Sequence, residues 1–68
     1  MLREYALVLL NDAFEAITEL NRAKITVIDV ATMLENEDLK KELLEAYSKM
    51  VAVENVLKRV VNETRDRE

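Results

Sequence analysis

The chain contains no glycine and no proline among its 68 residues. These two residues are the strongest local breakers of regular structure, so their absence predicts long, uninterrupted elements. It also excludes the glycine-rich loops that cradle phosphate groups. Cysteine and histidine are absent as well. Disulfides, thiolate metal sites and the usual structural zinc ligands are therefore excluded.

Charge and length limit the classes of protein further. The net charge is −4, from 14 acidic and 10 basic residues, so the average field repels phosphate backbones and anionic membrane surfaces. No apolar run is long enough to span a membrane, and we expect a cytoplasmic protein without a membrane partner. We expect one domain over residues 1–68, a size at which a single chain seldom buries enough apolar surface to be stable alone.

Apolar residues recur at helical spacing in two segments that a polar stretch at residues 35–38 separates. The first predicted helix covers about residues 2–35 and the second about residues 38–65, with the turn at about 35–38. Asn36 can cap the second helix, or close the first helix in a left-handed conformation. The predicted fold class is all-α, an antiparallel hairpin of two long helices.

A kink or break near residues 21–26 is an alternative for the first helix. Residues 25–30 are rich in β-branched side chains, which favour helix weakly, and Thr26 with Asp29 has the spacing of a helix start. A break would give three helices, of which the last two would look like a degenerate helix-turn-helix. The second helix of such a unit reads DNA, and here it would carry only Lys40 and Lys41 among more numerous carboxylates.

The apolar arcs of both helices are wider than one hairpin can cover. Tyr5, Leu9, Phe14 and Ile28 would stay in water unless a second copy covered them. We therefore expect the hairpin to dimerise into a four-helix bundle, with a larger helical oligomer or a hetero-complex as the alternatives. The predicted oligomer interface consists of apolar positions from both helices: Leu10, Ala13, Phe14, Ile17, Leu20, Val27, Ala31, Leu34, Leu39, Leu43, Ala46, Met50, Val53, Leu57 and Val60.

Lys24 and Glu54 interrupt the two apolar arcs and are the candidates for fixing register or specificity. A buried unpaired charge is costly, so each side chain either reaches water at an edge of the bundle or pairs with another subunit. Lys24 could also lie in the break described above. Counted from the turn, Lys24 is level with about Lys49, and Glu54 with about Glu19. This comparison argues against a direct pair within one hairpin.

The sequence predicts no catalytic, cofactor-binding or metal-binding residues. Its hydroxyl side chains have no histidine partner for nucleophilic catalysis, and long bundled helices rarely form the concave site that acid–base chemistry needs. Asp12, Glu15 and Glu19 share one face of the first helix and could hold Mg²⁺ or Ca²⁺ with a partner helix. A solvated acidic face is the favoured interpretation. We expect no enzymatic activity.

The sequence therefore predicts a small protein–protein interaction module: an adaptor, regulator or assembly factor that acts as a homodimer and docks another protein helix against helix. The alternative is a nucleic-acid-associated regulator. The expected architecture is similar to dimeric hairpins of the plasmid copy-number (Rop) type, which grip RNA across a bundle face, and this likeness is one of architecture. The candidate contacts would be Lys41, Lys49 and Arg59. The acidic net charge argues against a nucleic-acid partner.

Overall fold

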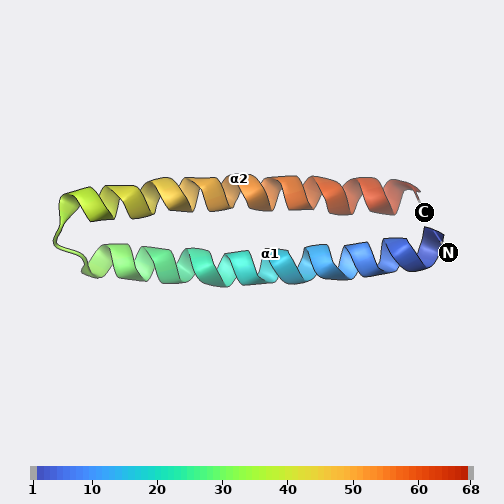
Figure 1. Ribbon diagram of the computed structural model, residues 1–68, viewed down its shortest axis with the longest axis horizontal. Helices are drawn as coiled ribbons and strands as arrows, with labels where there is room; N and C mark the ends of the chain where they lie inside the picture. Colours follow the sequence, from blue (N-terminus) through green and yellow to red (C-terminus); the bar gives the residue numbers. More distant parts are fainter. Residues whose placement is uncertain (1, 68) are drawn as a thin grey trace.

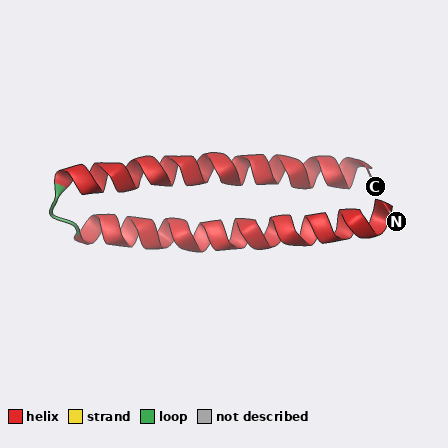
Figure 2. Ribbon diagram, in the orientation of Figure 1, coloured by secondary structure: helices red, strands yellow, loops and turns green. Residues whose placement is uncertain are grey.

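The computed structural model describes residues 2–67 and shows two α-helices that lie side by side in opposite directions (Figure 1). α1 spans Leu2–Met33 and α2 spans Glu37–Arg67. A short loop at residues 34–36 joins them, and the outer ends of the two helices lie together at the other end of the molecule (Figure 2). The predicted helical hairpin is confirmed. It is a rod with extents of 52 × 14 × 12 Å.

α1 continues without a break through residues 21–26, so the alternative of a kink or a third helix is wrong. The Thr26 hydroxyl does not cap a new helix. It donates to the Arg22 carbonyl oxygen at 3.1 Å, and the Thr18 and Thr32 hydroxyls make the same bond to the carbonyl four residues earlier. The β-branched segment is thus accommodated within one helix. The side-by-side packing also differs from the wide crossing of a helix-turn-helix, so the structure does not contain that motif.

Asn36 sets the start of α2. Its side-chain oxygen accepts hydrogen bonds from the backbone N–H groups of Asp38 at 3.0 Å and Leu39 at 3.1 Å, which is the geometry of a helix N-cap. Its carbonyl accepts the Lys40 N–H at 3.0 Å. The capping prediction is confirmed. The left-handed alternative is not adopted, because no residue in the described part of the chain has a positive φ.

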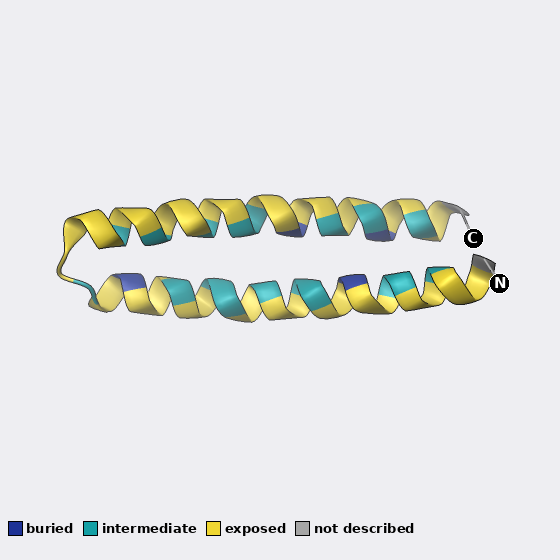
Figure 3. Cartoon of the chain, in the orientation of Figure 1, coloured by how far each residue is buried: buried dark blue, intermediate teal, exposed yellow. Residues whose placement is uncertain are grey.

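The two helices meet along a seam formed by two rows of residues from each helix, with a spacing of seven within each row. From Ala6 to Leu34 and from Lys40 to Thr64, all members of these rows are buried or half-buried, and Figure 3 shows this covered side of each helix turned toward the other. The rows of α1 are Leu10, Ile17, Lys24 and Ala31, and Ala6, Ala13, Leu20, Val27 and Leu34. Those of α2 are Lys40, Tyr47, Glu54 and Val61, called the Glu54 row, and Leu43, Met50, Leu57 and Thr64, called the Leu57 row.

The seam forms a thin core. Within the described residues, only Ala13, Ala31 and Val61 are buried apolar residues, and no large side chain is fully covered. The 7.9 kDa chain exposes 5593 Å², whereas a folded monomer of this mass exposes about 4,400 Å². The hairpin therefore leaves much more surface in water than an ordinary small domain does.

Candidate interaction surface

The hairpin has two long sides, and a contact between Phe14 and Arg65 shows which rows share one of them. The Arg65 guanidinium carbon lies 5.2 Å from the centroid of the Phe14 ring, within the range of a cation–π interaction. Phe14 belongs to a row that borders the seam on α1, and Arg65 to one that borders it on α2. We call this side the mixed face: Leu7, Phe14, Asn21, Ile28, Leu44, Val51, Lys58 and Arg65.

The opposite side carries only apolar residues. In each helix, two rows border the seam, one on each side of it. The bordering rows that do not belong to the mixed face must therefore lie on this opposite side. We call it the open face: Leu9, Ala16, Ala23 and Val30 on α1, and Leu39, Ala46, Val53 and Val60 on α2. No charged or polar side chain interrupts these rows within residues 9–30 and 39–60.

The open face has the composition of an unpaired interface. Val30 is 40% exposed, Leu39 48% and Val53 51%. Exposed charged residues lie one row further out, including Asp12 and Glu19 beyond its α1 edge. An apolar centre with a polar rim is the usual anatomy of a protein–protein contact surface.

The predicted interface residues fall in three places. Those on the seam are Leu10, Ala13, Ile17, Leu20, Val27, Ala31, Leu34, Leu43, Met50 and Leu57, and those on the open face are Leu39, Ala46, Val53 and Val60. Phe14 lies on the mixed face and is 43% exposed. The sequence reasoning did not single out Ala16, Ala23 and Val30. Their spacing of seven from Leu9 was the available signal, but the apolar residues of this helix were treated as one broad arc and not as separate rows.

Lys24 and Glu54 form an ion pair across the seam, with 2.5 Å between the Lys24 Nζ and the Glu54 Oε2. The Lys24 side chain is 17% exposed and that of Glu54 is 6% exposed. No other ion pair within 4.0 Å occurs among the side chains that the structure describes. The expectation that these residues would not pair within one hairpin is therefore wrong.

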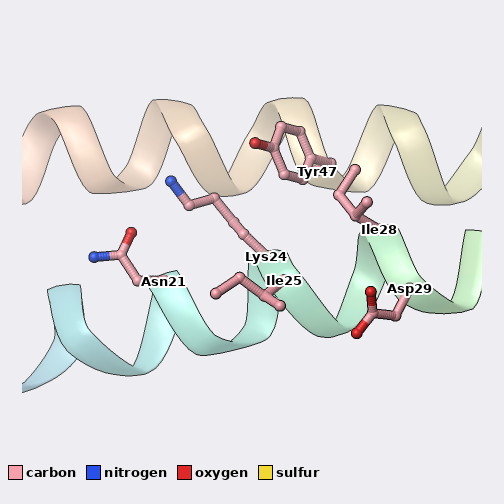
Figure 4. A pocket seen from close by; sticks show the side chains of 6 residues that line it. All are labelled: Asn21, Lys24, Ile25, Ile28, Asp29 and Tyr47. Atoms are coloured by element: carbon pink, nitrogen blue, oxygen red, sulfur yellow. The ribbon is translucent and has the colours of Figure 1, made fainter.

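The direction in which helical side chains lean explains this pair. The Cα–Cβ bonds of an α-helix tilt toward its N-terminus. In an antiparallel hairpin, Lys24 therefore leans toward the outer end, and Glu54 leans back toward the loop. Figure 4 shows Lys24 reaching toward α2 and toward the turn that holds Asn21. Backbone levels alone place the two residues too far apart to pair, because they do not include this lean.

The Lys24 ammonium holds the pKa of the Glu54 carboxyl below its ordinary value of 4.5. The hydrogen bond from Lys24 is the main cause, burial of the carboxylate opposes it, and the positive charges of Lys24 and Lys58 add to the lowering. The ionised form of Glu54 is therefore the form that the folded hairpin stabilises.

We expect the ion pair to contribute stability that is lost in acid. The unfolded chain binds a proton at Glu54 near pH 4.5 and the folded chain only at lower pH, so protonation favours unfolding. The contribution is complete above pH 4.5 and disappears as the pH falls through the folded pKa. Urea unfolding at neutral pH and at about pH 3 should show a smaller acid-induced loss of stability in K24M/E54M than in the wild type. Equal losses in both proteins would contradict this role.

A shallow groove of about 350 Å³ opens on the hairpin beside the ion pair. Figure 4 shows the residues that line it, Asn21, Lys24, Ile25, Ile28, Asp29 and Tyr47. Asn21 and Ile28 belong to the mixed face, so the groove lies on that side. Its lining combines apolar, amide and charged side chains, in contrast to the uniform open face.

The candidate nucleic-acid contacts lie apart from both faces. Lys41, Lys49 and Arg59 are exposed on the side of α2 away from α1, where Glu45 and Glu63 separate them. They form no continuous basic surface.

Within residues 2–67, no group of three acidic, histidine or cysteine side chains converges as metal ligands would. In the same part of the chain, neither helix includes a stretch apolar and long enough to cross a bilayer.

No protein-family model matches this chain, and no curated protein or solved structure shows significant similarity to it. The structure itself defines the class of fold. It is an antiparallel two-helix hairpin, with coiled-coil spacing at its seam and one long face that is apolar throughout residues 9–30 and 39–60.

Proposed function

We propose that the protein is a non-enzymatic protein–protein interaction module that acts as a homodimer. In the dimer, two hairpins pack open face against open face and form a four-helix bundle. The open face is the observation that carries the proposal. Every member on both helices is apolar, and Leu39 and Val53 are each about half exposed. An apolar face of this length is uncommon on a monomer.

The hairpin exposes enough additional surface to form an interface with a second copy of itself. The chain exposes 5593 Å², about 1,200 Å² more than is usual for its mass. Stable protein–protein interfaces bury about 1,200–2,000 Å² in total from both partners, so the two copies have enough surface to form one. In a two-fold dimer the same patch pairs with itself, and a patch without charges leaves none unpaired.

The mixed face is a poorer surface for self-association. Lys58 and Arg65 both border the seam there, and two copies joined through this face would cover these charges, although the face has no carboxylate to pair with them. Covering an unpaired charge disfavours association. The open face has no such cost, which is why the proposal places the second copy there.

In the proposed bundle, the mixed faces stay on the outside and are free to bind another protein. Phe14 at 43% exposed and Ile25 at 64% exposed are large apolar side chains on or beside that face. Side chains of this kind serve as anchors when a partner helix docks. An adaptor, a regulator or an assembly factor would use the bundle in this way.

Thermal unfolding at several protein concentrations tests the homodimer. If folding and association are coupled, the midpoint temperature should rise by about 5 °C for each tenfold increase in concentration. The measurement is circular dichroism at 222 nm over a hundredfold range of concentration. A midpoint that does not depend on concentration would contradict the proposal.

A further inference from the structure

α2 has two rows that could lie beside the Leu57 row in the seam. One is the Glu54 row, and the other is the apolar row of the open face, Leu39, Ala46, Val53 and Val60. Burial of apolar surface favours the second choice. The structure makes the first choice. Glu54 is only 4% exposed, whereas Leu39 and Val53 stay about half exposed.

Lys24 supplies the reason for this choice. From Ala6 to Leu34 it is the only charged residue in the α1 seam rows, and its side chain is mostly covered. A covered ammonium without a partner is costly. Glu54 is the only carboxylate in either candidate row or in the Leu57 row. Only the observed rotation of α2 therefore places a carboxylate against Lys24.

We infer that the Lys24–Glu54 ion pair sets the rotation of α2 about its own axis and so leaves the open face available to a second copy of the chain. A turn of about 50° would bring the apolar row into the seam and move Glu54 away from Lys24. Polar pairs in a coiled-coil seam commonly select the partner or the register. In this hairpin the loop already determines which two helices pair. The ion pair can therefore still select the rotation of α2.

The effect of the pair on association rests on the proposed function, whereas its effect on rotation does not. The two are tested by separate measurements. Because the chain has no cysteine, a single introduced cysteine reports the exposure of its own position through its rate of reaction with a thiol reagent. The reporters are Val61→Cys in the Glu54 row and Leu57→Cys in the Leu57 row. The Leu57 row faces α1 in either rotation and serves as the control.

Each reporter is placed in the wild type, in K24M/E54M and in the charge swap K24E/E54K. Replacing a buried ion pair by apolar residues of similar volume usually keeps a protein folded, and circular dichroism checks this. We expect the thiol of the Val61→Cys reporter to react about tenfold faster or more in K24M/E54M than in the wild type, because its row leaves the seam. The thiol of the Leu57→Cys reporter should keep its rate. The swap restores the pair, so the Val61→Cys reporter should return to the wild-type rate.

An unchanged rate of the Val61→Cys reporter in K24M/E54M, or equal acceleration of both reporters, would overturn the inference. So would failure of the swap to restore the rate. Should K24M/E54M lose helicity, K24L/E54L is judged by the same criteria. Loss of helicity in both would also overturn the inference, since the pair would then be required for the fold itself.

Sedimentation of the same variants without cysteine tests the consequence for association. We expect K24M/E54M to dimerise more weakly than the wild type, and K24E/E54K to dimerise as the wild type does. Equal dimerisation of all three proteins would contradict the link to the open face. A monomeric wild type would contradict the proposed function and leave the thiol result as the test of rotation.

Discussion

The substitution Val53→Glu is expected to convert the homodimer into a monomer. Val53 lies on α2 in the open face and is 51% exposed in the single hairpin, so a glutamate is tolerated there while the chain is alone. In the dimer the partner covers the position, and the two-fold axis places the new charge in the interface from each copy. Desolvation of these charges should weaken association by at least about a hundredfold.

The matched control is Ile25→Glu on the other side of the hairpin. Ile25 is 64% exposed and lies beside the mixed face, so its substitution adds the same charge to an equally apolar exposed site. Analytical ultracentrifugation should show V53E as a monomer and I25E as a dimer at the same concentration. Dissociation by I25E but not by V53E would place the second copy on the mixed face instead.

The substitution Ala31→Glu is expected to abolish the folded hairpin. Ala31 is 3% exposed and belongs to the same seam row as Lys24. Lys24 leans away from Ala31 toward the outer end, and Lys40 in the facing row leans toward the loop. Neither lysine therefore offers the new carboxylate a partner. An uncompensated buried charge costs about 3–5 kcal/mol, as much as the whole core of a chain this short usually supplies, about 3–5 kcal/mol. Circular dichroism should show loss of most of the helical signal.

Ala52→Glu provides the control for helix propensity and net charge. Ala52 is exposed on the side of α2 away from the seam, where a charged side chain stays in water. Its free energy of unfolding should remain within about 0.5 kcal/mol of the wild type. A folded A31E protein with wild-type stability would contradict the placement of Ala31 in the seam.

The helices and the turn could be predicted from local signals in the sequence. The lack of glycine and proline, the apolar spacing and the cap at Asn36 are each read from neighbouring residues, and they predicted the helical hairpin and the start of α2 to within a residue. Leu43, Met50 and Leu57 could be predicted as interface residues because they are apolar at heptad spacing. These features depend on local periodicity and capping alone.

The rotation of α2 could not be predicted in this way. The predicted interface included Ala46 and Val53 together with Leu43, Met50 and Leu57, whereas the structure places Glu54 beside the Leu57 row in the seam. That choice depends on Lys24, which is 30 residues away in sequence, and on the lean of two long side chains. The α1 part of the open face was missed for a related reason, since only the contact between Phe14 and Arg65 shows which flanking rows share a side.

Sedimentation equilibrium of the unmodified chain is the most direct test of the central claim, that the open face is covered by a second copy. At micromolar concentration we expect a species of twice the 7.9 kDa chain mass, in reversible exchange with the monomer on dilution. A fully helical species that keeps the mass of one chain over the whole concentration range would contradict the account.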